Sequence, residues 1–269
     1  LLYSKKTQND IKQESPKQLI KLNKKESKIL NVTSHELRTP IAAIKGYIQM
    51  ILKQKLGDIN EEQKKRLEVV LRNTNRLDNL IQDLLDISRL DSGRMKFITK
   101  KTNIEKMINE TIETVKHTAY KKKIQIKDSI EKDLPEIIID HDRIKQVIIN
   151  LINNSIKFSK NNSEISISIK QNDDYILFEI KDYGRGISKD KIDDIFEAFY
   201  QAKSEDKKLG GVGLGLAISR GIIVAHGGKI WVESKGIPEE GSKFSFTLPI
   251  KEIKDVEKRF EEIDIFTTT

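Results

Sequence analysis

The chain has 269 residues, of which 37% are hydrophobic and 33% are charged, so it can build one large domain or two ordinary ones. It contains no cysteine, which excludes disulfides and thiolate metal sites, and no apolar run approaches the ~20 residues that span a bilayer. The net charge of +8 suggests a nucleic-acid partner, but basic and acidic residues are interspersed along the chain, so we expect a solvated, Lys-rich surface and no nucleic acid.

Residues 1–27 are rich in Lys, Gln and Asn, and we expect them to form a linker or the end of an incoming signalling helix. The first residue is Leu rather than Met, which suggests a piece of a longer protein. We therefore expect this portion to be cytoplasmic, with any membrane segment of the full-length chain lying upstream.

Residues 28–92 are predicted to form a helical hairpin. Gly57 can end the first helix and Asn60 can cap the second. In both helices the apolar residues recur at steps of three and four, and in the second they form a heptad seam. The seam positions of the second helix are Leu67, Val70, Thr74, Leu77, Ile81, Leu84 and Ser88. An exposed seam needs a partner, which favours a dimeric four-helix bundle; a hairpin packed on its own C-terminal domain is the alternative.

The first helix contains the motif SHELRTP (residues 34–40), in which a histidine precedes a proline by five positions. His35 lies one residue past Ser34, a seam position, so we expect its side chain to face outward. Pro40 removes a backbone donor and clashes with the carbonyl of Glu36, at a cost of roughly 3 kcal/mol. The motif therefore predicts a locally weakened helix beside His35.

After residue 92 the helical periodicity gives way to mixed helices and strands, which is typical of an α+β domain. We predict a hinge linker over residues 93–102, a domain over residues 103–250 and a charged tail over residues 251–269. The predicted helices of the domain cover residues 103–121, 141–158, 188–196 and the segment that ends near His226. The predicted strands cover residues 124–127, 137–140, 164–170 and 175–182, with two more after residue 228.

Several motifs of this domain could meet a ligand, although each is weak alone. Asn150, Asn154 and Lys157 share one helix face, where amide oxygens suit Mg²⁺ and the lysine suits phosphate. The motif DYGRGI (residues 182–187) joins an Asp to glycines that allow close backbone approach. The motif GGVGLGLAISRGI (residues 210–222) leads into a helix N-terminus that can bind phosphate, but it matches neither the P-loop nor the dinucleotide fingerprint. The aromatic-rich stretch IFEAFYQ (residues 195–201) alone indicates core packing.

In this order, and together with SHELRTP, the motifs resemble those of the sensor histidine kinases of two-component signalling, over about residues 27–250. The resemblance implies a dimeric helical hairpin, forming a four-helix bundle, followed by an ATP-binding α/β sandwich. That superfold is shared with DNA gyrase, heat-shock chaperone and mismatch-repair ATPases. Residues 200–209 would form a lid over ATP.

The resemblance also implies roles for individual residues. His35 would be the phosphoacceptor and Glu36 its neighbouring base, while Arg38 and Thr39 complete the motif. Asn154 would hold Mg²⁺, and Asp182 would read the adenine amino group. The remaining implied contacts with nucleotide, metal or phosphate are Asn150, Lys157, Phe158, Gly184, Gly186, Gly211, Gly213, Leu214 and Gly215.

The implied function is ATP-dependent autophosphorylation on His35 in a homodimer, followed by transfer to an aspartate in the receiver domain of a response regulator. Thr39 implies phosphatase activity on that regulator as well. An ATPase of the same superfold is an alternative, disfavoured because such enzymes place a Glu where this chain has Asn150. A non-catalytic nucleotide-binding scaffold is a second, and a nucleic-acid-binding module, suggested by charge alone, is a third. His117, His141 and His226 are assigned no role.

Overall fold

A computed structural model describes residue 34 and residues 36–201 and 212–251. His35, Gly211 and most of the predicted lid therefore lie outside the described residues. The chain divides into two compact units, Leu1–Ser88 and Arg89–Thr269, and each is described by itself. In the described part of the chain, no helix is both long enough and apolar enough to cross a membrane.

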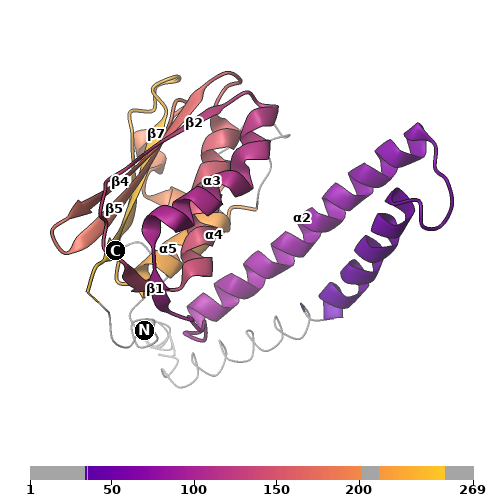
Figure 1. The fold of residues 1–269 in the computed structure, drawn as a ribbon, viewed down its shortest axis with the longest axis horizontal. Coiled ribbons are helices and arrows are strands. Elements are labelled where there is room, and N and C mark those ends of the chain that lie inside the picture. Colours follow the sequence, from indigo (N-terminus) through magenta and orange to yellow (C-terminus); the bar gives the residue numbers. More distant parts are fainter. Residues whose placement is uncertain (1–33, 35, 202–211, 252–269) are drawn as a thin grey trace, which may run out of the picture. The chain divides into compact units, whose positions relative to one another are not determined.

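The first unit is a helical hairpin, as predicted. Its first helix covers residues 36–52 and includes Pro40, and the second, α2 (Glu61–Asp91), extends past the boundary into the second unit (Figure 1). The start of α2 is fixed by a reciprocal pair of hydrogen bonds. The backbone N–H of Gln63 donates to Asn60 Oδ1 at 2.8 Å, and the backbone N–H of Asn60 donates to Gln63 Oε1 at 2.9 Å. This capping box confirms Asn60 as the cap of the second helix.

The two helices of the hairpin pack through aliphatic side chains. Ile41 of the first helix forms a buried cluster with Ile81 and Leu85 of α2. Ile48, seven residues after Ile41, and Thr74, seven residues before Ile81, are also buried. One heptad stripe on each helix therefore closes the hairpin on itself.

A second apolar stripe on each helix stays exposed. Leu37 and Ile44 of the first helix are 46% and 49% exposed, and Val70 and Leu77 of α2 are 45% and 48% exposed. Both pairs are seven residues apart, as neighbouring positions of a heptad seam are. The predicted seam positions of α2 therefore belong to two different stripes. Thr74 and Ile81 are buried in the hairpin, whereas Val70 and Leu77 face solvent. The homodimer itself stays a prediction.

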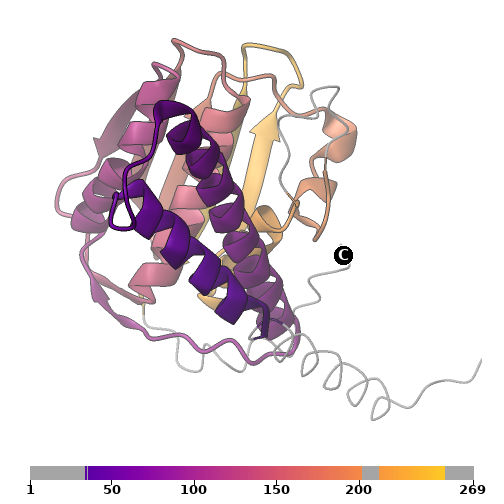
Figure 2. The ribbon, with the colours of Figure 1, turned by 90° about the vertical axis from the view of Figure 1, so that its right-hand side faces the viewer.

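The second unit has a five-stranded mixed sheet with the order β2-β4-β5-β7-β6. Its strands are β2 (Gln125–Ile130), β4 (Glu164–Asn172), β5 (Tyr175–Asp182), β6 (Ile230–Ser234) and β7 (Ser242–Pro249). Only β2 and β4 are parallel; the other pairs are antiparallel. Helices α3 (Ile104–Lys121), α4 (His141–Phe158) and α5 (Gly215–Ala225) cover one face of the sheet (Figures 1 and 2). This layered arrangement confirms the predicted α+β sandwich.

The predicted helix over residues 188–196 is wrong. The segment instead forms two short 3₁₀ turns, η1 (Lys189–Lys191) and η2 (Asp194–Phe196). The bonds that close them span three residues, from Lys191 N–H to the Ser188 carbonyl and from Glu197 N–H to the Asp194 carbonyl, both at 2.9 Å. Neither turn has a side-chain N-cap bond, so no capping group stabilises the start of a longer helix in this segment.

The predicted hinge linker contains a strand. Within it, β1 (Lys100–Thr102) pairs antiparallel with β3 (Ile137–Ile139) to form a separate two-stranded sheet. The sequence of β1, Lys-Lys-Thr, has no apolar alternation, so its pattern gives no strand signal. The chain that enters the second unit is therefore attached to it from at least residue 100.

The residues just before β1 are held by a buried histidine. His226 is 3% exposed, and its ring meets the ring edge of Phe97 at a centroid distance of 5.0 Å. Its Nε2 accepts from the backbone N–H of Asp140 at 3.0 Å, so Nδ1 carries the proton and donates to the Ile222 carbonyl at 2.8 Å. The Asp140 carboxylate in turn accepts from the backbone N–H of Ile98 at 2.8 Å. His226, to which the sequence assigned no role, thus connects α5, the start of α4 and the linker.

This arrangement requires a neutral His226. Burial lowers the pKa of His226 below its ordinary value of 6.5, so the unfolded chain takes up this proton at a higher pH than the folded one. The free energy of unfolding should therefore fall as the pH drops below about 6.5, by at most ~1.4 kcal/mol per unit of pH. Urea unfolding followed by the fluorescence of Trp231, the single tryptophan and part of β6, measures this in the second unit alone.

The comparison uses His226→Gln, which cannot titrate in this range, and His117→Gln, which changes an exposed histidine of α3. We expect the pH dependence to be shallower in His226→Gln and unchanged in His117→Gln. Equal slopes in wild type and His226→Gln would show that His226 is not the group responsible.

Candidate functional site

Helix α4 presents polar side chains beside a buried apolar face. Its N-cap is Asp140, whose side chain accepts from the Arg143 N–H at 3.1 Å. The buried residues of the helix are Ile144, Val147, Ile148, Leu151, Ile152, Ser155 and Ile156. Asn150, Asn154 and Lys157 are half-buried, at the edge of this apolar face. Amphipathic packing on the sheet therefore fixes where these three polar groups lie.

Asn150 connects α4 to the first turn of α5. Its Nδ2 donates to Ser219 Oγ at 3.0 Å, and Ser219 Oγ donates to the Gly215 carbonyl at 2.9 Å. A Cβ at Gly215 would lie 2.5 Å from Asn150 Oδ1, so a side chain there would displace the Asn150 amide. Leu214, the N-cap of α5, is buried and provides no side-chain cap. The first N–H groups of α5 are thus not satisfied by a capping side chain.

Asp182 ends β5 and is 4% exposed. Its Oδ1 accepts from the backbone N–H of Gly184 at 2.8 Å and from that of Ser242 at 3.3 Å, while Oδ2 accepts from Ser155 Oγ at 3.5 Å. Burial raises the pKa of Asp182, and the three donors act in the opposite direction. The carboxylate is therefore held in one orientation, with its better donors on Oδ1 and only a long contact on Oδ2.

Two cations lie over the ring of Phe158 at the end of α4. Lys157 Nζ is 4.6 Å from the ring centroid and the Arg185 guanidinium carbon is 4.5 Å from it. A Cβ at Gly184 would lie 2.6 Å from the Phe158 carbonyl oxygen, so the loop after β5 runs directly against the end of α4. Arg185 belongs to the motif DYGRGI, and the sequence alone assigned it no role.

Two further glycines of the predicted site adopt left-handed backbone conformations. Gly186 has a φ of +72° and Gly213 a φ of +80°, and both conformations favour glycine. A Cβ at Gly213 would meet the Tyr200 carbonyl oxygen at 2.2 Å, and the Phe199 N–H donates to the Gly213 carbonyl at 3.0 Å. The segments on either side of residues 202–211 are therefore joined at Gly213.

These contacts bring together three segments that are far apart in the sequence. Residues 150–158 meet residues 213–219 through Asn150, and they meet residues 182–184 through Ser155 and Phe158. Ser155 and Ser219, which orient Asp182 and Asn150, were not predicted. Ser155 could have been noticed because it directly follows Asn154, whereas nothing in the sequence relates Ser219 to Asn150.

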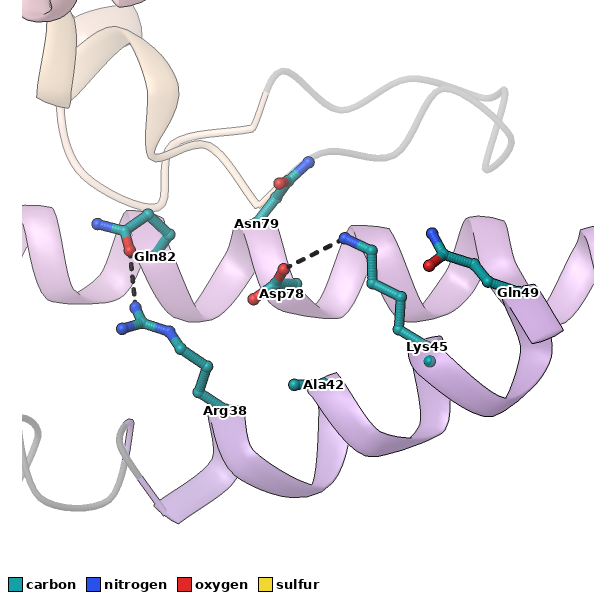
Figure 3. Close-up of a pocket in the computed structure, with 8 residues that line it drawn as sticks. Arg38, Ala42, Lys45, Gln49, Asp78, Asn79 and Gln82 are labelled. Atoms are coloured by element: carbon teal, nitrogen blue, oxygen red, sulfur yellow. Dashed lines mark hydrogen bonds and ion pairs between the residues drawn. The ribbon is translucent and has the colours of Figure 1, made fainter.

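The described residues of SHELRTP belong to the first unit. Glu36 and Thr39 are exposed, while Arg38 reaches across to α2, where its Nη2 donates to Gln82 Oε1 at 2.8 Å (Figure 3). Gln82 Nε2 donates onward to Asp86 Oδ1 at 3.0 Å. Arg38 is therefore part of a polar bridge between the helices of the hairpin.

A groove runs along this bridge between the first helix and α2. Figure 3 shows Arg38 and Lys45 extending from the first helix towards α2, and Lys45 Nζ lies 3.8 Å from Asp78 Oδ2. The residues that line the groove are Arg38, Ala42, Lys45, Gly46, Gln49, Asp78, Asn79 and Gln82. Ala42 and Gly46 of the first helix leave a hollow there, which polar side chains of both helices border.

Comparison with known proteins identifies two family modules in this order. Residues 25–93 match the His Kinase A (phospho-acceptor) domain, and residues 139–252 match the histidine kinase-, DNA gyrase B- and HSP90-like ATPase. The chain is 36% identical over 241 residues to the sensor protein KdpD of Clostridium acetobutylicum, covering 88% of this chain and 26% of KdpD. This chain thus spans about a quarter of that relative's length.

Two solved structures are similar over most of the chain. Full-length ShkA in complex with AMPPNP has a TM-score of 0.71 and 27% identity, covering 85% of this chain and 47% of ShkA. The histidine kinase ThkA in complex with the response regulator protein TrrA has a TM-score of 0.57 and 27% identity, covering 83% of this chain and 61% of that chain. With both family modules present in order, the chain belongs to the sensor histidine kinases of two-component systems.

Proposed function

We propose that this chain binds ATP in its second unit, transfers the γ-phosphoryl group to His35 and passes it on to an aspartate of a response regulator. The observation that carries the proposal is that α4 contacts both other segments of the site within the region that matches the ATPase module: Asn150 meets Gly215, and Ser155 donates to Asp182. The phospho-acceptor module precedes that region in the same chain, which favours transfer to a side chain over simple hydrolysis.

The adenine end of the nucleotide would lie against Asp182. Because the stronger donors of the protein are on Oδ1, Oδ2 can accept from an exocyclic amino group such as that of adenine. Gly184 and Gly186 would let the ligand approach the backbone, and Phe158 would border the same pocket. AMPPNP, the nucleotide analogue bound in the ShkA structure, has such an amino group on its base.

The phosphates would lie towards α5. The uncapped N-terminus of α5, which follows Gly213 and Leu214, offers backbone N–H groups and a partial positive charge. Lys157 would add a cation from α4. Phosphoryl transfer depends mainly on positioning and on neutralising the phosphate charge, which these groups would supply. The resemblance to histidine kinases also implies that Gly211 lies here, but that residue lies outside the described part of the chain.

Asn154 would hold Mg²⁺. It is half-buried, and in the described part of the chain no residue pairs with its side chain, so its carbonyl oxygen is available as a hard ligand. The described residues contain no group of three His, Cys, Asp or Glu side chains that could hold a metal alone. This fits Mg²⁺, which usually takes few protein ligands and keeps waters and substrate phosphates, and which would offset phosphate charge.

In the transfer step, His35 Nε2 would form a bond to the γ-phosphorus while the bond from that phosphorus to the ADP oxygen breaks. The proton on Nδ1 of the imidazole would pass to Glu36, whose carboxylate is exposed and next in sequence. The phosphoryl group would then move to the response regulator. ThkA, which is similar to this chain, has been solved in complex with such a protein. The groove between the first helix and α2, which polar and charged side chains border, would contact that partner.

The first test follows labelled phosphate. Incubation with Mg²⁺ and γ-labelled ATP should label the wild type at a group that survives alkali and is lost in acid, as phosphohistidine does. His35→Gln should lose this label, whereas His117→Gln, altered at an exposed histidine of α3, should keep it. Equal release of free phosphate by all three proteins without bound label would instead identify an ATPase.

The second test concerns the homodimer. The exposed stripe formed by Leu37, Ile44, Val70 and Leu77 would be buried against a second copy, completing a four-helix bundle. A charge in that stripe should therefore weaken association. We expect Leu77→Glu to raise the dimer dissociation constant at least about tenfold, roughly 1.4 kcal/mol, in sedimentation equilibrium. Arg76→Glu alters the adjacent exposed residue of α2 and should leave association unchanged; an equal effect would contradict this interface.

The third test concerns phosphatase activity. Thr39 lies four residues after His35, so the two share a helix face, and its hydroxyl could position water beside a bound phosphoaspartate. Thr39→Ala should slow dephosphorylation of the response regulator by about 10²-fold while leaving labelling of His35 within about twofold of wild type. Thr39→Ser, which keeps the hydroxyl, should retain most of the phosphatase rate. Loss of both activities in Thr39→Ala would indicate a distorted helix instead.

A further inference from the structure

Lys122 binds the end of helix α4 from outside it. It follows the last residue of α3, and its ammonium group donates to the carbonyls of Ile156 and Lys157 at 2.8 Å each and to that of Ser159 at 3.2 Å. An ammonium group has three donors, and all three are used here. The last carbonyls of a helix have no partners inside it, so this contact satisfies groups that would otherwise need water.

The three carbonyls flank Phe158. Ile156 and Lys157 precede it and Ser159 follows it, so Lys122 fixes the backbone on both sides of this residue. The Phe158 carbonyl itself points to the loop after β5, where a Cβ at Gly184 would lie 2.6 Å away. A shift of the end of α4 would therefore move Phe158 into or away from Gly184, which is bonded to Asp182.

Electrostatics also favour this contact. The C-terminus of a helix carries a partial negative charge, and a cation placed there makes stronger hydrogen bonds than a neutral donor. The α3 side of the contact is itself fixed, because the Lys122 N–H donates to the Ala119 carbonyl and its carbonyl accepts from the Asn162 N–H at 3.0 Å. Lys122 therefore holds the end of α4 at a fixed position relative to α3.

We propose that Lys122 is a positioning residue for the adenine end of the nucleotide site, acting through Phe158 and the loop that carries Asp182 and Gly184. This inference rests on the proposed ATP site. It assigns a role in nucleotide affinity to a lysine whose ammonium group bonds backbone carbonyls at the end of α4. Its neighbours provide an internal comparison, since Lys121 and Lys123 are exposed and Lys122 alone of the three is half-buried.

The experiment compares Lys122→Met with Lys121→Met. Each variant removes one positive charge, and the two positions are adjacent in the sequence. Dissociation constants for ATP and for adenosine are measured by calorimetry, together with the thermal midpoint and the kcat and KM of autophosphorylation. We expect Lys122→Met to raise the dissociation constants for ATP and for adenosine by the same factor, about tenfold. KM for ATP should rise by that factor with kcat nearly unchanged, and Lys121→Met should match wild type.

The comparison of ligands separates positioning from charge. Adenosine has no phosphates, so an equal loss for both ligands assigns the effect to the adenine end. If Lys122→Met lowers the thermal midpoint but binds both ligands like Lys121→Met, Lys122 only stabilises the helix end and the proposal is overturned. A loss confined to ATP overturns it too, because the ammonium would then act on the phosphates.

If Lys122→Met does not fold, a second variant, Lys122→Arg, still tests the proposal. Lys122→Arg retains the cation, but a planar guanidinium fork cannot meet three convergent carbonyls as an ammonium does. We expect a loss of about threefold for both ligands, and unchanged affinity would overturn the proposal. A wild type that binds neither ligand would refute the ATP site itself, which is a distinct result from a wild type that binds while the Lys122 variants are unaffected.

Discussion

The closeness of three backbone segments around α4 is the constraint on which the second unit depends. Helix α4 buries its apolar face in the core, so its polar edge can lie only where neighbouring segments leave room. Two neighbours have no side chain at the contact, Gly215 against Asn150 and Gly184 against the Phe158 carbonyl. A methyl group at either position would meet atoms at 2.5–2.6 Å, well inside van der Waals distance. The site is therefore shaped by packing before any ligand is present.

This constraint changes how the glycines are understood. The sequence motifs relate Gly184, Gly213 and Gly215 to the nucleotide, through the resemblance to histidine kinases. In the structure Gly184 and Gly213 are also required by the protein itself, since a side chain would clash with the carbonyl of Phe158 or Tyr200, and a side chain at Gly215 would displace the Asn150 amide. A loss of activity on replacing one of them by alanine would therefore not establish a nucleotide contact. Asp182 is more informative, because its carboxylate can be changed without removing a close backbone approach.

The sequence was most informative where local chemistry decides the outcome. The bounds of α4 were predicted because its apolar period is clear up to Phe158. Asn60 was predicted as a cap because its short polar side chain can accept from a backbone N–H of the first turn. The helix expected over residues 188–196 is wrong because this segment has no side-chain cap and closes two short turns through backbone bonds instead. Patterns within a few residues of each other thus carried most of the correct predictions.

Contacts between distant segments could not be predicted from pattern alone. The bond from Asp140 to His226 joins residues 86 apart in sequence, and that from Asn150 to Ser219 joins residues 69 apart. Each depends on how α4 and α5 pack, which the composition of either helix does not specify. The same limit applies to Lys122, whose two lysine neighbours give no sign that the middle one is bonded. The sequence does not distinguish a buried neutral histidine from a solvated one, so the role of His226 could be recognised only in the folded structure.

The hairpin shows why a correctly predicted heptad spacing does not determine which surface each apolar stripe packs against. Buried Ile41 and Ile48 and exposed Leu37 and Ile44 form two stripes with the same spacing of seven. Two such stripes are what a helix needs when it contacts both its hairpin partner and a second copy. Half-burying an aliphatic side chain contributes on the order of 1 kcal/mol, so four per chain in two chains can support association. Because Arg38 is one turn from Ile41 and bonded to Gln82, a change in that association would act directly on the helix that carries the phospho-acceptor motif.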